Sequence, residues 1–599
     1  MFRRNAIVFV GSVLLLTALG LTPNNAQANL GQCAQPFTAG GDPSASDCLY
    51  ILQTAVGNRT CDNPCICAPK GTLPVRATDA LICLARSVNP GQAVNCPCAS
   101  LRGAAFAFTP NPDVGDVNIR PKYTATDYVG AFAQGDAMTA AAGDWTAGWT
   151  IELHGNHTVW HPSSAGTLNG AVPTATGTCP TGTTLLGNTA LPNGFAGHMD
   201  ICQLPAQFNV ANAMPLAART LTLTNDNIYR YGGGASQGTK IGNGDAAGAT
   251  PASVNNNFLV IEPGTLLLGG AQEALMISRG SQITVNGTAA NPVMMGSQTW
   301  FTNWLGGSNG TSGAQEWGGL VLMGFATINI PGGEGIAEGF LNPERYGGGA
   351  APVDSDSSGS VNYLVIANAG FDLDGNGSEL NGMTFYGVGY GTTVDHVQIH
   401  RNFDDNFEFF GGKVVALHLV GTDGNDDNID TDNGFQGGIQ FAVIKQKDGL
   451  GDKGFESDND ATGSTNNPRT QPTVVNLTHL GTDGSAGTVS GYEHTGWHIR
   501  RRSGYFIWNN ITQKNDVACI RLQDVLGPNA GVLTNPDDGT LQVHNTVAFC
   551  PTATQGVYAT TGADPVGDET TWFTAAGAND STSDPTLNSF GYPGDPDNN

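Results

Sequence analysis

The fold of this chain is decided by residues 381–460, which fall into three consecutive segments: NGMTFYGVGYGTTVDHVQIHRNFDDNFEFFGG (381–412), KVVALHLVGTDGNDDNIDTDNGFQGG (413–438) and IQFAVIKQKDGLGDKGFESDND (439–460). Each segment contains a short apolar alternation, a turn, an acidic cluster and a second short strand. A period of roughly 20–24 residues, with strands of period two inside each unit, is typical of stacked β coils. The three segments therefore predict a solenoid in which each unit forms one coil.

Two alignments between the units give the expected register of the coils. The apolar alternations are expected to stack as three pairs, Val397 and Ile399, Leu417 and Leu419, Phe441 and Val443. The acidic segments align Phe407-Glu408 with Ile429-Asp430 and Phe455-Glu456. Since alternate side chains of a strand face opposite sides, the apolar member of each pair faces inward. We therefore expect Glu408, Asp430 and Glu456 to form one exposed column.

The column favours a bound cation. Like charges about 5 Å apart cost roughly 3 kcal/mol at an effective dielectric of 20, and either a divalent cation or protonation of one member relieves this repulsion. Hard oxygen ligands suit calcium. The side chains expected to bind Ca²⁺ here are Asp405, Glu408, Asp427, Asp430, Asp432, Glu456 and Asp458. The alternative interpretation is a solvated acidic face whose acids serve as turn residues.

A second calcium candidate is DLDGNGSEL (372–380). Asp372, Asp374 and Asn376 occupy the first, third and fifth positions of an EF-type loop, and Gly377 occupies the sixth. The twelfth position is Met383 rather than Glu, so the loop is incomplete. An ordinary glycine-rich turn is the competing interpretation.

The composition excludes some partners. The 599 residues carry a formal net charge of −26, whereas nucleic-acid binding depends on clustered Lys and Arg. Abundant glycine (83 residues) indicates many turns, and 40% hydrophobic residues is not a disordered composition. A solenoid accommodates this length by adding coils.

The N-terminus has the organisation of a secretory signal. Arg3 and Arg4 precede an apolar run over residues 6–21, and Ala26-Gln27-Ala28 forms a small-x-small cleavage site. We expect cleavage after Ala28 and export to the extracellular space or the outer cell surface, with the periplasm as the alternative. A transmembrane helix competes with this interpretation, but no apolar run after the signal is long enough to span a bilayer.

Cysteine usage agrees with export. The 12 cysteines are an even number, which favours disulfides over soft thiolate metal sites in an oxidising compartment. Eight of them lie between Cys33 and Cys98, where the sequence leaves the pairing open. Cys179 with Cys202, and Cys519 with Cys550, are expected as local pairs.

Residues 41–98 contain a two-fold repeat. GDPSASDCLYILQTAVGN is echoed by GTLPVRATDALICLARSVN, and each copy has an Asp (Asp47, Asp79) at the start of a helix of about ten residues. The repeat resembles the duplicated dockerin-type module, which implies calcium loops ending at these aspartates and docking to a partner protein. The second loop lacks the family's Asp/Asn ladder, so a small disulfide-held helical module remains the competing interpretation.

Several phrases beyond the opening stretch resemble the right-handed parallel β-helix (pectin-lyase-like) class of exported bacterial proteins. They are IEPGTLLLG (261–269), ISRGSQITVNGTAANP (277–292), EWGGLVLMG (316–324), DDNFEFFGG (404–412), GDKGFESDND (451–460) and GWHIRRRSGYFIWN (496–509). The resemblance spans roughly residues 144–550 and implies the fold, not the function. The expected fold class is therefore mainly β, a right-handed parallel β-helix with a small disulfide-rich helical N-terminal module.

The expected domain organisation has five parts. They are a signal peptide (1–28), the Cys-rich dockerin-like module (29–100), a β-rich preface with long loops (101–255), the parallel β-helix (256–550) and a C-terminal cap or flexible tail (551–599).

Two functions remain open at this point. The first is a calcium-stabilised structural or binding module for a polysaccharide or a surface protein. The second is a polysaccharide lyase or glycoside hydrolase. The resemblance implies that a lyase of this fold uses calcium to neutralise a uronate and a Lys or Arg as base, for which Lys453 and Arg401 are candidates, while a hydrolase would use Glu408, Asp430 and Glu456. Acids that repeat with each coil favour the first function.

Overall fold

The computed structural model describes most of the chain from residue 172 to residue 523 and shorter stretches on either side. The described residues are 44–55, 77–88, 118–126, 128–132, 144–153, 160, 172–192, 195–232, 237–306, 313–372, 378–447, 449–482, 494–523, 540–557, 573 and 580–582. The chain divides into two compact units, Met1–Ala105 and Phe106–Asn599. Among the described residues, no helix combines the length and apolar character needed to cross a membrane.

The first unit contains two helices joined by a disulfide. Helix α2 (Ala45–Ala55) and helix α3 (Ala77–Val88) are linked by Cys48–Cys83. A capping box begins α2, since the N–H of Ser44 donates to Asp47 Oδ2 (2.8 Å) and the N–H of Asp47 donates to Ser44 Oγ (3.3 Å). Asp47 therefore caps its own helix, and Asp79 is buried in the first turn of α3. The residues of the expected calcium loops before 44 and between 56 and 76 lie outside the described residues.

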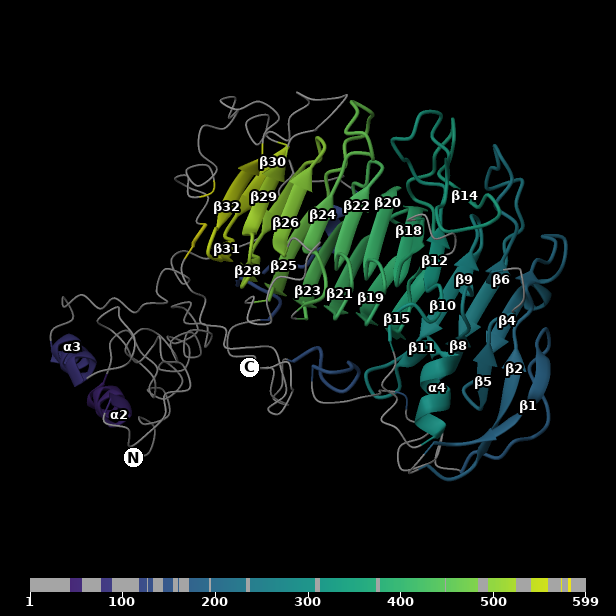
Figure 1. The fold of residues 1–599 in the computed structure, drawn as a ribbon, viewed down its shortest axis with the longest axis horizontal. Coiled ribbons are helices and arrows are strands. Elements are labelled where there is room, and N and C mark those ends of the chain that lie inside the picture. The colour runs from purple at the N-terminus through teal and green to yellow at the C-terminus, as the bar shows by residue number, and fades with distance from the viewer. Residues whose placement is uncertain are drawn as a thin grey trace, which may run out of the picture. The chain divides into compact units, whose positions relative to one another are not determined.

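The second unit is a parallel β-helix made of two long sheets (Figure 1). The first sheet has 17 strands: β1 (Thr184–Ala190), β2 (His198–Gln203), β4 (Thr220–Leu223), β5 (Asn227–Arg230), β7 (Phe258–Ile261), β8 (Leu266–Gly269), β10 (Gln282–Asn286), β11 (Val293–Ser297), β15 (Gly359–Ala367), β19 (Thr393–His400), β21 (Val415–Thr422), β23 (Gly438–Lys445), β25 (Thr473–Leu480), β27 (Tyr505–Trp508), β28 (Ile511–Gln513), β30 (Leu541–His544) and β31 (Val547–Phe549).

The second sheet has 11 strands: β3 (Gln207–Phe208), β6 (Gly238–Ile241), β9 (Ala274–Ile277), β12 (Leu320–Met323), β18 (Met383–Val388), β20 (Phe407–Gly412), β22 (Ile429–Asp432), β24 (Lys453–Ser457), β26 (Thr495–Arg500), β29 (Ala518–Gln523) and β32 (Thr554–Val557). The remaining elements are the pairs β13 (Gly335–Ile336) with β14 (Arg345–Tyr346) and β16 (Phe371–Asp372) with β17 (Glu379–Leu380), helix α4 (Gln298–Leu305), and the 3₁₀ helices η2 (Arg120–Lys122) and η3 (Leu216–Arg219).

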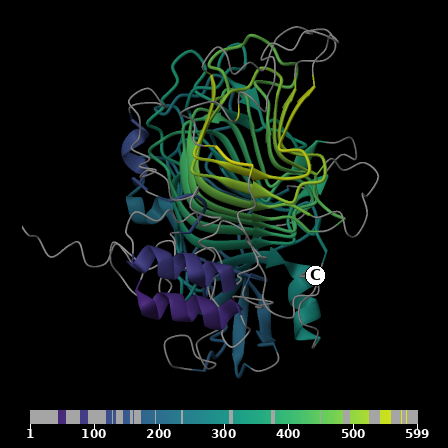
Figure 2. The same cartoon turned by 90° about the vertical axis from the view of Figure 1, so that its left-hand side faces the viewer.

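The chain alternates between the two sheets, which confirms the predicted fold class. β19 pairs in parallel with β21 and β21 with β23 in the first sheet, while β20 pairs with β22 and β22 with β24 in the second. Figure 2, viewed from the C-terminal end of the solenoid, shows the coils stacked behind the last yellow strands. Parallel pairing already joins β4, β5 and β6 to β7, β8 and β9, so the coils begin before the expected boundary at residue 256.

The apolar register predicted for the first sheet is wrong, by two residues between β19 and β21 and by one residue between β21 and β23. Val397 pairs with Leu419, not Leu417, and Leu419 pairs with Ala442 rather than Val443. The cause is a left-handed corner within each long strand, where His396 (φ 58°), His418 (φ 52°) and other residues interrupt the alternation. A strict period-two template cannot locate this interruption. The residues at the corner are Tyr363, His396, His418, Phe441 and Asn476.

Stacked side chains fill the space between the sheets. Phe385 lies over Phe409 with ring centroids 4.5 Å apart, and Phe409 lies over Phe435 at 4.7 Å. Further along, Phe455 stacks on Trp497 at 4.2 Å. All five side chains are essentially inaccessible to solvent. Equivalent positions of successive coils therefore form continuous apolar columns.

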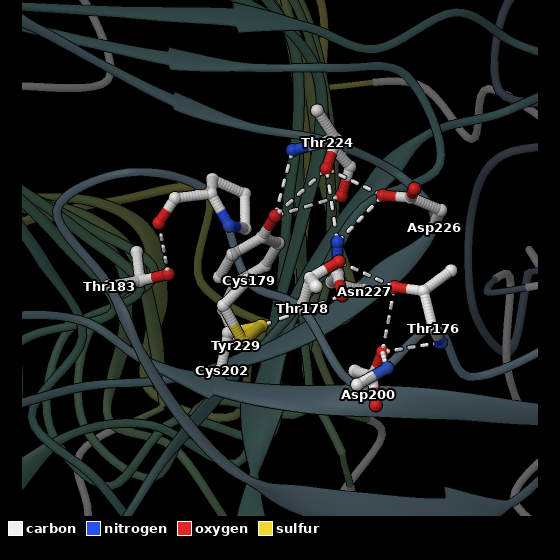
Figure 3. Close-up of a disulfide and its surroundings, with 12 residues drawn as sticks. Thr176, Thr178, Cys179, Thr183, Asp200, Cys202, Thr224, Asp226, Asn227 and Tyr229 are labelled. Atoms are coloured by element: carbon white, nitrogen blue, oxygen red, sulfur yellow. Dashed lines mark hydrogen bonds between the residues drawn. A yellow bond between two sulfur atoms is a disulfide. The ribbon is translucent and has the colours of Figure 1, made fainter.

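Both local disulfides expected from the sequence are present. Cys179 is bonded to Cys202 and Cys519 to Cys550. Figure 3 shows the first bridge beside β2, where Asp200 accepts hydrogen bonds from the N–H groups of Thr176 and Gly177 (both 2.8 Å). At the other end, Phe573 is fully buried in the core and the N–H of Ser581 donates to Thr546 O (2.9 Å). These described C-terminal residues close the last coil.

A segment from the preface lies on the outer face of the first sheet. Side-chain amides hold it there: Gln440 exchanges two hydrogen bonds with the main chain of Thr124, and Gln398 does the same with Ile151. Trp145 and Trp149 of this segment contact the left-handed corner.

The aromatic columns lead to a stability prediction. Phe409→Ala should lower the free energy of unfolding by about 3–5 kcal/mol, because it removes the middle ring of a buried stack and leaves a cavity. Leu341→Ala, at a side chain that is 66% exposed, should change it by less than about 0.5 kcal/mol. Urea unfolding followed by circular dichroism measures both. Equal effects of the two substitutions would contradict the proposed core.

Candidate functional site

The acidic column has the register predicted from the sequence. Glu408 pairs with Asp430, and Asp430 pairs with Glu456, on the neighbouring strands β20, β22 and β24. The next partners along the same line are His498 on β26 and Arg521 on β29. The line therefore changes from acidic to basic within the second sheet.

The predicted exposure of the column is wrong. Glu408 and Glu456 are only 7% and 6% exposed, and Asp430 is half-buried. Neighbouring side chains cover the carboxylates: Asn381 Nδ2 donates to Glu408 Oε2, and Lys453 Nζ lies 3.1 Å from Glu456 Oε1. An alternation shows which side of a strand faces outward, but it does not show what packs on that side.

The turn before the column forms a hydrogen-bond ladder between coils. Asn381 Oδ1 accepts the N–H of Asp405 (3.1 Å), Asp405 Oδ1 accepts the N–H of Asp427 (2.9 Å), and Asp427 Oδ1 accepts the N–H of Lys453 (2.8 Å). Each side chain therefore satisfies a main-chain donor of the following coil. This arrangement gives Asp405 and Asp427 the structural role of turn residues, whatever else they bind.

The basic end of the column is neutralised by ion pairs. Lys453, His498 and Arg500 all contact Glu456, and Arg500 Nε lies 2.9 Å from Asp458 Oδ1. Burial raises the pKa of Glu456, but the contact with His498 and the charges of Lys453 and Arg500 outweigh it and hold the pKa at about 2.

Lys453 is poorly suited to act as a base. Burial lowers its pKa, but the charges of Asp427, Glu456 and Asp452 outweigh this effect and raise the pKa above the ordinary value. The amine therefore stays protonated at neutral pH. Arg401, the other candidate base, forms ion pairs with Glu152 and Asp423 at 3.7 Å.

The acidic end is not neutralised in this way. A loop between β13 and β14 brings Glu338 into hydrogen-bond contact with Glu408, and burial together with the charge of Glu379 raises the pKa of Glu338 to about 7. Burial and the charges of Glu338 and Asp430 raise the pKa of Glu408 well above its usual range. Burial and the charges of Glu456 and Asp458 raise the pKa of Asp430 likewise.

The loop that carries Glu338 is anchored by a buried arginine. Arg279 is inaccessible to solvent, donates to Gly347 O (2.7 Å) and forms an ion pair with Glu334 (2.9 Å). Tyr346, at the end of the same loop, packs against Tyr386 with ring centroids 4.7 Å apart. The loop is thereby fixed over the acidic end of the column.

Several groups of carboxylates bring ligand oxygens within 4.8 Å of one another. These groups are Asp404 with Asp405 and Asp426, Asp405 with Glu408 and Asp430, Asp426 with Asp427 and Asp452, and Asp427 with Asp430 and Glu456. Five predicted ligands are thus brought together: Asp405, Glu408, Asp427, Asp430 and Glu456.

The structure adds acids that were not among the predicted ligands. Asp404, Asp426 and Asp452 occupy equivalent turn positions in the three repeats, so the sequence already places them near the column, although not among its ligands. No sequence signal links Glu338 or Glu379 to the column. Glu338 reaches it through the loop between β13 and β14, and Glu379 through the short strand β17.

The other predicted ligands have different surroundings. Asp458 forms ion pairs with Arg500 and Arg501, and burial with the charges of Asp458 and Asp430 raises the pKa of Asp432. Asp372 lies in the short strand β16, while Asp374 and Asn376 of the EF-type loop lie outside the described residues.

Comparison with known proteins identifies the β-helix. Residues 249–587 match the family described as a pectate-lyase like beta helix domain, a span that covers more than half of the chain. No curated protein and no solved structure matches the chain.

The raised pKa values predict a pH dependence of stability. A carboxyl whose pKa rises on folding destabilises the protein above its unfolded pKa, and the penalty disappears as pH falls. Burial is the main cause that raises the pKa of Glu338 to about 7 and that of Asp426 to about 6. In chelator, protonation of these carboxyls should therefore raise the melting temperature as pH falls from about 8 to 5, where the low pKa of Glu456 keeps its stabilising contribution intact. Buried His400 and His479, whose pKa values are lowered by burial, oppose this rise below about pH 6.5, so the effect is read as the difference between the protein and its Glu338 variant.

Glu338→Gln should flatten this dependence above about pH 6, because it removes the group that titrates there. The matched control is Glu262→Gln, a carboxyl in the turn between β7 and β8. Differential scanning fluorimetry across the pH range measures all three proteins. A dependence that is the same in Glu338→Gln as in the unsubstituted protein would contradict the assignment.

Proposed function

Because the chain belongs to the pectate-lyase-like beta-helix family, we propose that it is an exported, carbohydrate-binding β-helix protein whose acidic site holds calcium. The family itself indicates a carbohydrate-related protein. Export is supported by the N-terminal signal pattern and by three disulfides, which persist in oxidising compartments. A polysaccharide, or a surface protein that carries one, is the proposed partner.

The observation that carries the calcium proposal is the close approach of Asp405, Glu408 and Asp430, whose ligand oxygens lie within 4.8 Å of one another. All donors are carboxylate oxygens, which suit Ca²⁺ better than they suit softer metals. No basic side chain forms an ion pair with Glu408 in the part of the chain that the structure describes, so nothing there offsets the burial and the neighbouring acids that disfavour its ionised form. A divalent cation would supply the missing positive charge.

Calcium would also give the site affinity for acidic sugars. The ion takes six to eight oxygen ligands, and carboxylates and hydroxyls of a glycan can complete a coordination shell that the protein fills only in part. Protein and uronate are both anionic, so direct contact between them would be repulsive. We therefore expect binding of uronate-containing polysaccharides to depend on calcium.

Calcium binding should raise the melting temperature. At a calcium concentration about one hundred times Kd, the expected gain is about 2.7 kcal/mol in the free energy of unfolding. Glu408→Gln and Asp430→Asn should reduce the gain, whereas Glu262→Gln should leave it unchanged. Scanning fluorimetry with and without calcium, together with isothermal titration calorimetry, measures these effects. No gain in the unsubstituted protein and no calcium by elemental analysis would remove the proposal.

Glycan binding is tested separately. Polygalacturonate and a neutral glucan are immobilised and the protein is applied in calcium or in chelator. The expected result is calcium-dependent retention on polygalacturonate, weakened by Asp430→Asn but not by Glu262→Gln. Retention that is equal on both glycans, or equal in chelator, would contradict a cation-mediated interaction.

The second candidate function is glycan cleavage, and the contact between Glu338 and Glu408 favours it. Two carboxyls in hydrogen-bond contact can hold one proton between them. A hydrolase needs such a protonated carboxyl as the general acid that protonates the leaving group. A lyase is less well supported, because Lys453 is held in its protonated form. Incubation with uronates and neutral glycans distinguishes the functions: new reducing ends that disappear in Glu338→Gln would establish hydrolysis, and unsaturated products would establish a lyase.

A further inference from the structure

A second set of metal-ligating side chains lies on the first sheet, at its left-handed corner. His396 and His418 occupy equivalent positions of the adjacent strands β19 and β21, and Asp395 precedes the first of them. Both rings direct Nδ1 at the same carboxylate oxygen, since Asp395 Oδ1 lies 2.8 Å from His396 Nδ1 and 2.7 Å from His418 Nδ1. The three ligand atoms lie within 4.8 Å of one another.

Aromatic rings hold the two imidazoles in place. Tyr363 stacks on His396 at 4.2 Å, His396 on His418 at 4.2 Å, and His418 on Phe441 at 4.8 Å. Trp145 approaches the edge of the stack, with its ring centroid 5.0 Å from that of His418. Neighbouring coils therefore fix the rings without using either Nδ1.

The cluster is also reachable from solvent. The side chains of Asp395, His396 and His418 are 30%, 14% and 22% exposed. Burial raises the pKa of Asp395, but hydrogen bonds from the two imidazoles outweigh it and hold the pKa at about 2, so the carboxylate is anionic. An anionic oxygen beside two ring nitrogens is an attractive environment for a cation.

We propose that Asp395, His396 and His418 form a binding site for a divalent transition metal such as Zn²⁺ or Cu²⁺. Imidazole nitrogens with one carboxylate suit these metals, whereas the oxygen-only column on the second sheet suits calcium. Three protein ligands leave a position for water or another ligand. The inference is independent of the proposed carbohydrate function, because the two sites share no residue.

Binding requires a small rearrangement. Each ring must present Nδ1 as a lone pair, with its proton on Nε2, and the rings must tilt from their interplanar angle of 18° toward a common centre. The Nδ1 atoms would then lie about 2.0–2.1 Å from zinc, with the Asp395 carboxylate at about 2.0–2.2 Å. The metal would replace the two contacts that Asp395 now makes with the rings.

The competing interpretation is a purely structural stack in which Asp395 accepts hydrogen bonds from both rings. His418→Phe separates the two possibilities, because phenylalanine keeps the stacking between His396 and Phe441 but removes a nitrogen donor. Asp395→Asn removes the anionic ligand and leaves both rings unchanged. His544→Gln is the matched control, since His544 also packs on an aromatic ring, that of Trp508, with centroids 4.9 Å apart.

The full-length protein is stripped with chelator and titrated with Zn²⁺ by calorimetry, in millimolar calcium so that oxygen-only sites are occupied. The expected result is one tight zinc per chain, weakened more than about tenfold in His418→Phe and Asp395→Asn and unchanged in His544→Gln. Cu²⁺ provides a second readout, because copper bound at this distance should quench the fluorescence of Trp145, and Trp145→Phe should reduce that quenching. Circular dichroism and melting curves confirm that each variant is folded.

The proposal would be overturned if the unsubstituted protein bound no zinc, if His418→Phe and Asp395→Asn both kept full affinity, or if His544→Gln lost as much affinity as they do. The sequence also contains His154, His157 and His161, which lie outside the described residues. His157→Gln is therefore included. Zinc binding that is lost in His157→Gln and kept in His418→Phe would assign the metal to that other segment and reject the corner site.

Discussion

Parallel pairing between successive coils, about 4.8 Å apart, is the constraint on which the rest of this structure depends. It places each side chain directly over its equivalent in the next coil. For aromatic rings this spacing is favourable, as in the stack of Phe385, Phe409 and Phe435. For carboxylates it is unfavourable, because Glu408, Asp430 and Glu456 repeat with the same period. The core and the acidic site are thus two results of one repeat.

The repulsion between the repeated carboxylates meets different surroundings along the length of the column. In the turn, Asp405 and Asp427 accept main-chain N–H groups of the following coil, but burial and the neighbouring acids still raise the pKa of both carboxyls well above the usual range. At one end of the column, Lys453 and Arg500 supply full positive charges to Glu456. At the other end, Glu338 adds a further carboxyl against Glu408. The imbalance at that end is the feature that supports the proposed calcium site.

The left-handed corner explains why the alternation of apolar residues predicted the strand pairing in one sheet but not in the other. The repeat length and the pairing of Glu408, Asp430 and Glu456 could be predicted, because β20, β22 and β24 are short uninterrupted strands. The pairing of Val397 could not, because His396 and His418 turn the chain inside β19 and β21. A residue with positive φ that is neither Gly nor Asn leaves no mark in a hydrophobic pattern. At this corner two histidines and an aspartate meet.

The sequence by itself determined the class of fold, the two local disulfides and the column of Glu408, Asp430 and Glu456, because each depends on spacing along the chain. Only the tertiary structure decided that the column is buried, that Glu338 joins it and that Lys453 is held protonated. Those features depend on loops and neighbouring coils far apart in sequence. Burial and charge are properties of the whole environment of a side chain, and a linear repeat specifies only the part contributed by its own strands.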